Sequence, residues 1–412
     1  MSGPAHPHTV TSGAGALRDR LAGRVEELLA VRAAANELFF DACAEQLARL
    51  CHRVAERFSR GGRLIALGDS PQARSDAHHV AVEFVHPVIV GKRALPAIAL
   101  GGGDGGLRER VELIAGAQDI VLAFGREPDT LSALSRAARC GCLTVAFEQV
   151  GAECELVPAV ADPLARQELI ETAYHLLWEL VHVFFEHRCL LEGGDARSAR
   201  DPGASSFLYP FLTDGERDLE GVIADVRRSI SMKAQETGVL RAQTLTEGGD
   251  TLLEAAVALR RRFDAGASML VLGNGGSATD AMDAVADFAE CPGAWVARPA
   301  IALTDASIFS AIANDVGVES VFRRQVIAYG RPGDVLLAFS TSGDSLNVIE
   351  ALLEGRARGL LTLAMAGYGG GRIAAKSLAD HVLVSRSQHI PRIQEAQASA
   401  SHVLRTLVEE VA

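Results

Sequence analysis

The sequence predicts an α/β protein of two tandem domains, each a parallel β-sheet flanked by helices. Short apolar runs alternate with helical patterns, the alternation occurs twice, and both occurrences carry the same ordered landmarks. Each occurrence opens with a long helical stretch, at about 20–60 and about 215–265. Apolar runs separated by helices are typical of parallel strands, because the crossover helices cover the sheet faces.

The landmarks that recur are two apolar strands and a Gln-Glu…His pattern on the last helix. In chain order, residues 58–68 match 263–273, residues 120–124 match 335–339, and Gln167, Glu168 and His175 match Gln394, Glu395 and His402. Ordered matches of this kind indicate a tandem duplication. We expect a disordered tail at 1–18, a first domain at 19–190, a Gly-, Pro- and Ser-rich linker at 191–218 and a second domain at 219–412.

Composition limits the partners. The 412 residues are 48% hydrophobic and 22% charged, which is ordinary for a globular protein, and the net charge is −12. Such a charge argues against nucleic acid and anionic membranes as partners. No apolar run has transmembrane length, and the N-terminus does not resemble a signal peptide. Seven cysteines without a CxxC pair favour reduced thiols in a cytoplasmic protein.

Two strand-to-helix turns in the second copy carry the strongest functional signal. Glycines follow the first strand, and hydroxyl side chains follow the second. Short donors at a helix N-terminus suit a phosphate. The expected phosphate-binding residues are Asn274, Gly275, Gly276, Ser277, Ser340, Thr341, Ser342 and Ser345. The first copy has lost this chemistry, because Asp69, Pro71 and Glu127 stand at the corresponding places.

Several motifs together resemble the sugar isomerase (SIS) family and, within it, the phosphoheptose isomerases. They are Gly-Asn-Gly-Gly-Ser at 273–277, Ala-Ile-Ala-Asn-Asp at 311–315, Arg-Pro-Gly-Asp at 331–334, Ser-Thr-Ser-Gly at 340–343 and Arg-Ile-Gln-Glu at 392–395. The resemblance covers roughly residues 220–412. It implies two tandem SIS domains, each a flavodoxin-like three-layer sandwich.

The resemblance also implies a divalent metal, usually zinc, held by a His and a Glu four residues apart and by a Gln and a His of the last helix. The first copy has the full set of His79, Glu83, Gln167 and His175. The i,i+4 spacing places His79 and Glu83 on one helical face, as a shared metal requires. The second copy has Asp283, Asp287, Gln394 and His402, which form a less complete second set.

By resemblance, the reaction is the isomerisation of sedoheptulose 7-phosphate to D-glycero-D-manno-heptose 7-phosphate through an enediol. Glu83 is the expected base and His175 its acid–base partner, with Asp287 and His402 as the fallback pair. Gln394 is expected to contact substrate, and Asn314 and Asp315 to contact its hydroxyls. Such a reaction needs a proton acceptor, a proton donor and an electrophile at the carbonyl.

The two copies have lost complementary parts, so we expect one copy to lend the metal set and the other the phosphate-binding loops. Members of the family resemble symmetric oligomers with active sites at subunit interfaces. We expect a dimer of tandem units, because the long first helix of each copy carries an apolar stripe.

Two alternatives from other classes remain open. One is a non-catalytic SIS protein that senses a sugar phosphate or binds a protein, like relatives that regulate replication initiation; the aspartates and degenerate loops favour it. The other is a glutamine-dependent aminosugar synthase or a hexose-phosphate isomerase. The lack of a cysteine-led N-terminal glutaminase segment argues against the synthase, and the Arg-Ile-Gln-Glu signature argues against the hexose isomerase.

Overall fold

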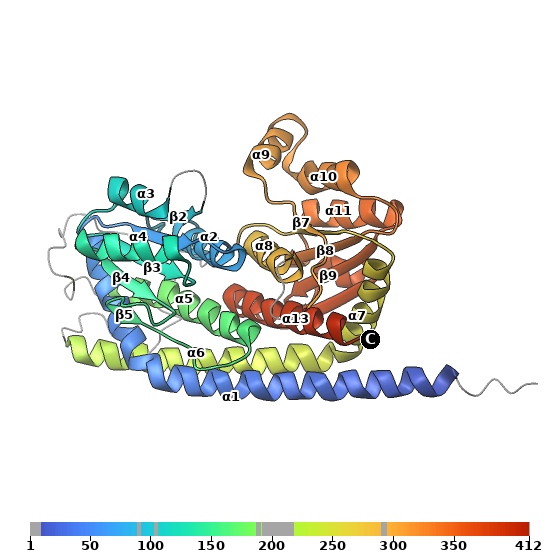
Figure 1. The fold of residues 1–412 in the computed structure, drawn as a ribbon, viewed down its shortest axis with the longest axis horizontal. Helices are drawn as coiled ribbons and strands as arrows, with labels where there is room; N and C mark the ends of the chain where they lie inside the picture. The colour runs from blue at the N-terminus through green and yellow to red at the C-terminus, as the bar shows by residue number, and fades with distance from the viewer. Residues whose placement is uncertain are drawn as a thin grey trace, which may run out of the picture.

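Two five-stranded parallel sheets form the core of the computed structural model, which describes residues 10–88, 92–102, 106–186, 191, 218–289 and 295–411 (Figure 1). The first sheet has the order β2-β1-β3-β4-β5 and the second, read in the same sense, β7-β6-β8-β9-β10. The two copies therefore have the same topology, and the predicted fold class is confirmed.

The first copy comprises α1 (Val10–Ser59), β1 (Leu64–Gly68), α2 (Pro71–Val85), β2 (Ala97–Gly101), α3 (Leu107–Ile114), β3 (Ile120–Phe124), α4 (Pro128–Arg139), β4 (Leu143–Ala146), β5 (Cys154–Glu155) and α5 (Pro163–Glu186). Strands β1 and β3 are buried along their whole length. This burial explains why they read as continuous apolar runs rather than as alternating patterns.

The second copy comprises α6 (Leu219–Glu247), α7 (Gly249–Asp264), β6 (Met269–Leu272), α8 (Gly276–Ala289), β7 (Ala300–Ala302), α9 (Ala306–Asp315), the 3₁₀ turn η3 (Val318–Ser320), α10 (Val321–Tyr329), β8 (Val335–Ser340), α11 (Leu346–Ala357), β9 (Leu361–Gly367), α12 (Gly371–Ala375), β10 (His381–Ser385) and α13 (Ile390–Glu410). The single helix expected at 215–265 is two helices that meet at Gly248. A Cβ on Gly248 would lie 1.9 Å from the Leu383 side chain, so glycine allows β10 to approach the junction.

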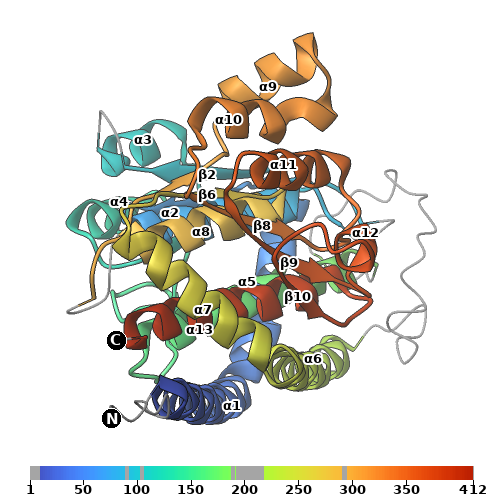
Figure 2. The same cartoon turned by 90° about the vertical axis from the view of Figure 1, so that its right-hand side faces the viewer.

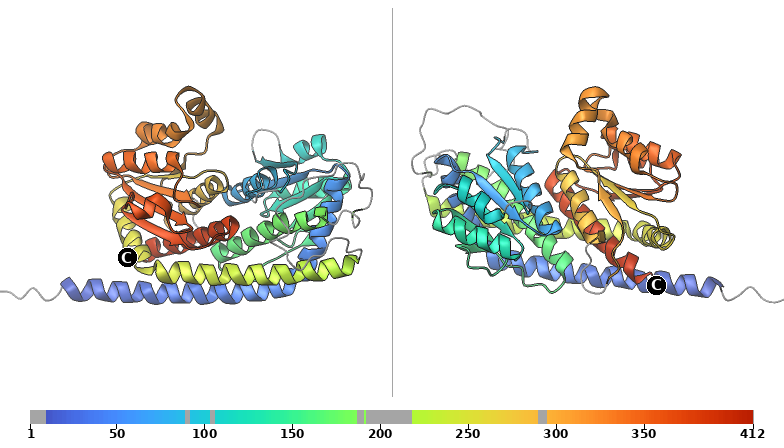
Figure 3. Two further views of the ribbon diagram at one scale, coloured as in Figure 1. Left: turned by 180° about the vertical axis from the view of Figure 1, so that it is seen from behind. Right: turned by 45° about the horizontal axis from the view of Figure 1, so that its top comes forward.

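The first helix of each copy packs partly on the other copy. Leu21, Val25 and Leu28 of α1 join the apolar core of the second copy. Val222 and Ile223 of α6 join the core of the first copy. The two helices run antiparallel along the base of both sheets (Figure 3). The apolar stripes that predicted a dimer are thus largely covered within one chain.

The ends of the predicted domains differ in part from the observed elements. Helix α1 begins at Val10, so residues 10–18, expected as tail, are helical. Residues 1–9 and most of the predicted linker at 191–218 lie outside the described residues. None of the helices in the described ranges combines the length and apolar character needed to span a bilayer.

Four helices meet where the two copies face each other. Helix α2 packs against α8, and α5 packs against α13. The Ser75 hydroxyl donates a hydrogen bond of 2.8 Å to the Thr279 carbonyl between α2 and α8. Helices α13 and α7 lie between the second sheet and the α1–α6 pair (Figure 2). Side chains of α2, α5, α8 and α13 consequently share one buried region.

Candidate active site

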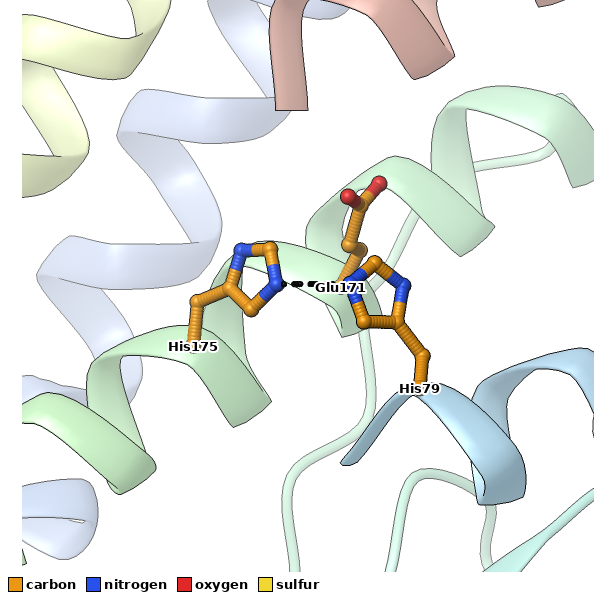
Figure 4. Close-up of side chains that lie close together, drawn as sticks. All are labelled: His79, Glu171 and His175. Atoms are coloured by element: carbon orange, nitrogen blue, oxygen red, sulfur yellow. Dashed lines mark hydrogen bonds between the residues drawn. The ribbon is translucent and has the colours of Figure 1, made fainter. Parts of the chain in front are cut away.

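Two buried histidines of the first copy define the first centre, which comprises His79, Glu83, Glu171, His175, Asp280 and Gln394. Figure 4 shows His79 of α2 facing His175 of α5, with Glu171 beside them. The Nε2 atoms of the two histidines are 3.3 Å apart. The Gln394 Nε2 atom is 3.3 Å from His79 Nε2, and the Glu83 Oε1 atom is 3.9 Å from it.

The carboxyl groups of the first centre lack the partners that buried charges need. Neither carboxylate oxygen of Glu83 has a hydrogen-bond partner among the described residues, although the side chain is fully buried. Burial raises the pKa of Glu83 to about 7 and the pKa of Glu171 and Asp280 well above their ordinary values. Burial and then His175 lower the pKa of His79 well below its usual value. A cation would satisfy this group.

The His175 ring is held in position by a carboxylate at its Nδ1 atom. Its Nδ1 atom lies 2.9 Å from Glu395 Oε1, and Arg392 pairs with Glu395 at 3.1 Å. Burial alone would raise the pKa of Glu395, but Arg392 and His175 lower it below its ordinary value. A carboxylate on the far nitrogen is the usual support of a metal-binding imidazole. Two imidazoles and a carboxylate therefore fit a zinc ion, and Gln394 can add its amide oxygen, which has no hydrogen-bond partner among the described residues.

The first of the two predicted phosphate loops of the second copy lies directly against this centre. A Cβ placed on Gly276 would be 2.0 Å from Gln394 Nε2 and 3.0 Å from His79 Nε2. The loop also needs glycine at Gly275, where φ is +57°. His79 of the first copy thus lies against the glycine loop of the second copy, and the division of metal and phosphate binding between the copies stays a prediction.

The second phosphate loop is tied to the first. The Asn274 and Asn347 side chains exchange hydrogen bonds of 3.0 and 2.9 Å. Within the second loop, the Gly343 N–H donates to Ser340 Oγ and the Asp344 N–H donates to Ser342 Oγ, each at 3.1 Å. Ser345 is the N-cap residue of α11. Hydroxyls and backbone N–H groups therefore gather at the starts of α8 and α11.

The expected sugar-binding pair lies apart from these groups. Asn314 and Asp315 are exposed at the end of α9, where the Asn314 amide donates to Asp315 at 2.8 Å. Within the described ranges, neither side chain forms a hydrogen bond or ion pair with the first centre. The contact with substrate hydroxyls stays a prediction.

The two glutamines are exchanged relative to the sequence-based grouping. Gln167, grouped with His79, instead donates a hydrogen bond to Asp283 Oδ1, whereas Gln394, grouped with Asp283, contacts His79. The physical reason is helix geometry: each glutamine precedes the histidine of its own helix by two turns, or about 12 Å. Helix α5 therefore contributes its histidine to the first centre and its glutamine to the second, and α13 does the reverse.

The second centre comprises Gln167, Asp283, Asp287 and His402. The His402 Nε2 atom lies 3.2 Å from Asp283 Oδ2 and 3.2 Å from Asp287 Oδ2. Burial alone would lower the pKa of His402, but Asp287 and Asp283 raise it well above its ordinary value. Burial raises the pKa of Asp287 to about 6. The predicted second set is thus assembled, with Gln167 in place of Gln394.

Glu171 and Asp280 belong to the first centre but were absent from the predicted sets. Glu171 groups with His79 and His175, whose ligand atoms lie within 4.8 Å of one another, and the Asp280 Oδ1 atom is 3.7 Å from His79 Nδ1. A signal for Glu171 was present, because it precedes His175 by one turn on the same face of α5. Asp280 carries no comparable signal.

Comparison with known proteins defines the class first. The family model described as SIS domain matches residues 234–367. The C-terminal domain of glucosamine-fructose-6-phosphate aminotransferase from Francisella tularensis covers 93% of this chain and 94% of its own, with a TM-score of 0.58 and 10% identity. At that identity the likeness shows the fold alone, which is that of a tandem SIS protein.

Sequence relatives are more specific. A phosphoheptose isomerase from Nitratidesulfovibrio vulgaris is 38% identical over 191 residues, which are 45% of this chain and 89% of the relative. One from Chlorobium phaeobacteroides is 43% identical over 175 residues, covering 41% of this chain and 76% of the relative. The chain belongs to the phosphoheptose isomerase family. It is an aldose–ketose isomerase of sugar phosphates, and each relative corresponds in length to about one copy.

Proposed function

We propose that the first centre converts sedoheptulose 7-phosphate to D-glycero-D-manno-heptose 7-phosphate, with zinc as cofactor. The observation that carries this proposal is the contact of Gly276 with His79 and Gln394. It brings a phosphate-type loop and a metal-type donor set to one place. One end of a phosphosugar can then be held at the loops while its carbonyl end lies at the histidines.

In this proposal the phosphate binds the N–H groups and hydroxyls at the starts of α8 and α11. The proposed contacts are Asn274, Gly275, Gly276, Ser277, Ser340, Thr341, Ser342 and Ser345. These donors are neutral or backbone groups backed by two helix dipoles, so they hold the dianion without a lysine. Asn314 and Asp315 are proposed to bind sugar hydroxyls when substrate is present.

His79, Glu83, His175 and Gln394 offer four donors for zinc, and Glu83 and His175 can transfer a proton only while they do not hold the ion. When bound, zinc would polarise the substrate carbonyl and lower the energy of the enediolate. Glu83 is the proposed base for the carbon-bound proton, because it is a carboxylate of the centre and burial raises its pKa to about 7 in the metal-free protein. His175 is the proposed acid for the neighbouring oxygen through Nε2, and the Glu395 contact at Nδ1 orients the ring.

The test is direct isomerisation of sedoheptulose 7-phosphate by the zinc-loaded full-length protein, followed by proton NMR of the anomeric region. We expect the aldose signal to grow to an equilibrium ratio, and unphosphorylated sedoheptulose to remain unchanged. A zinc-loaded, folded protein that leaves sedoheptulose 7-phosphate unchanged would refute the proposal and favour a sugar-phosphate sensor.

A further inference from the structure

A cavity at the edge of the second sheet has no part in the proposed isomerase reaction. It has a volume of about 620 Å³ and lies where β6 and β8 begin, whereas the predicted phosphate loops lie where these strands end. Its lining includes the whole Arg-Pro-Gly-Asp motif at 331–334, to which the proposed function gives no role. We propose that this cavity binds a small zwitterion that carries a guanidinium group, such as free arginine.

The first copy shows which group occupies the corresponding place when a side chain fills it. The Asp119 carboxylate, directly before β3, accepts hydrogen bonds from the backbone N–H groups of Arg63 and Gly116 at 2.7 and 2.8 Å. The Arg63 side chain contacts the same carboxylate, because its Nη2 atom lies 3.0 Å from Asp119 Oδ2. The same nitrogen donates a hydrogen bond to the Ile114 carbonyl. In the first copy a guanidinium group therefore lies between a buried carboxylate and a backbone carbonyl.

The second copy has the carboxylate but lacks the guanidinium group. Directly before β8, Asp334 accepts hydrogen bonds from the backbone N–H groups of Ser268 and Arg331 at 2.8 and 2.9 Å, in the same pattern. Ser268 therefore stands where the first copy has Arg63, and its short side chain leaves the cavity open. Asp334 is only 7% exposed, yet no side chain of the described residues pairs with it.

A guanidinium group on a ligand would restore the contacts that Arg63 makes in the first copy. A carboxylate offers about four acceptor positions, and the two backbone bonds of Asp334 leave the others for a ligand. Tyr329 holds the position of Ile114, since each precedes its aspartate by five residues, and it lines the cavity. A planar guanidinium group donates to a carboxylate through charge-assisted hydrogen bonds of fixed geometry, so this contact would select the ligand.

The other charged side chains of the lining are positive, so the ligand also needs an anionic group. They are Arg262 and Arg331. Within the described residues, the Arg262 side chain donates one hydrogen bond, of 3.4 Å to the Gly333 carbonyl, and the Arg331 side chain donates none. Two such groups would repel a simple cation, whereas a carboxylate on the ligand would pair with them. The cavity has the size of a small-molecule site, which suits a free amino acid with both charges.

The experiment is calorimetric titration of the full-length protein with arginine, which should bind at a single site. Citrulline has a neutral urea in place of the guanidinium group, and agmatine lacks the carboxylate. Each should bind at least about tenfold more weakly than arginine, because each loses one charge-assisted contact. Ser268→Arg should weaken arginine binding by at least about tenfold as well, because the new side chain would fill the cavity as Arg63 does in the first copy. The matched control is Ser268→Ala, which should bind arginine as wild type does.

Three results would each overturn the proposal. They are no binding of arginine to wild type, equal affinity of wild type for arginine and for either analogue, and wild-type affinity for arginine in Ser268→Arg. The comparison of arginine with its analogues requires no variant, so it decides the matter even if Ser268→Arg does not fold. Because none of these measurements uses turnover, their failure is distinct from failure of the isomerase proposal.

Discussion

Gly276→Ala tests the composite first centre with the smallest possible change. The new Cβ would stand 2.0 Å from Gln394 Nε2, where ordinary contact begins at 3.4 Å. The Gln394 amide must therefore withdraw by about 1.4 Å, and His79 Nε2, 3.0 Å from the same Cβ, is crowded as well. A misplacement of about 1 Å at a reacting centre costs about 10²-fold in rate.

The backbone should tolerate this change. Gly276 opens α8 with φ outside the left-handed region, and the clashing atom is the far end of a flexible side chain. We expect kcat/KM for sedoheptulose 7-phosphate to fall about 100-fold, equivalent to about 2.7 kcal/mol in the activation barrier. The circular dichroism spectrum and the unfolding temperature should change little.

Gly249→Ala is the matched control, because a Cβ there meets no atom within 4 Å and φ is not positive. It should keep wild-type kinetics. Wild-type kcat/KM in Gly276→Ala, with the protein folded, would refute the reasoning, since it would mean that contact between the loop and Gln394 has no part in the reaction.

Three further predictions concern phosphate, pH and assembly. Ser342→Asp should abolish binding of sedoheptulose 7-phosphate in calorimetry, because the new carboxylate would repel the phosphate. Glu127→Gln in the first copy should leave binding nearly intact. Unchanged affinity in Ser342→Asp would mean that the second loop does not bind the phosphate. Burial raises the pKa of Glu83 from 4.5 to about 7, so the folded metal-free protein binds this proton more tightly than the unfolded chain does. The unfolding temperature should therefore fall as pH rises from about 4.5 to about 7. Glu83→Gln should flatten this dependence of the unfolding temperature on pH, and an unchanged dependence would contradict the assignment. Because the stripes that predicted a dimer are covered within the chain, a dimer needs another apolar surface, and the exposed Leu38 (61%) and Val239 (62%) of α1 and α6 offer one. Leu38→Glu/Val239→Glu should then convert the dimer to a monomer in light scattering. A monomeric wild type would contradict the expectation.

The fold could be predicted from local signals. Continuous apolar runs such as 64–68 and 335–340 are strands because parallel strands are buried on both faces. The sequence also predicts the glycine turn after β6, since the conformation and the close contacts of this turn require glycine. The pairing of His79 with Glu83 follows from one turn of helix. These signals operate within a few residues.

The assembly of the centres could not be predicted in the same way. Gln167 and Gln394 change places because α5 and α13, from different copies, lie antiparallel side by side. The residue pattern along one helix does not indicate which helix lies beside it. The exchange of α1 and α6 between the two cores is hidden for the same reason, because an apolar stripe such as Val222 and Ile223 does not specify which surface covers it.

The central claim is that one active centre draws its residues from both copies, and the two glutamines test it most directly. Gln394→Ala and Gln167→Ala should be compared in the full-length protein for zinc content and for turnover of sedoheptulose 7-phosphate. We expect Gln394→Ala to lose at least tenfold more of both than Gln167→Ala, because the Gln394 amide lies 3.3 Å from His79. The opposite order, with Gln167→Ala the more damaged, would contradict this claim, because it would place the reaction at the second centre or within the first copy alone.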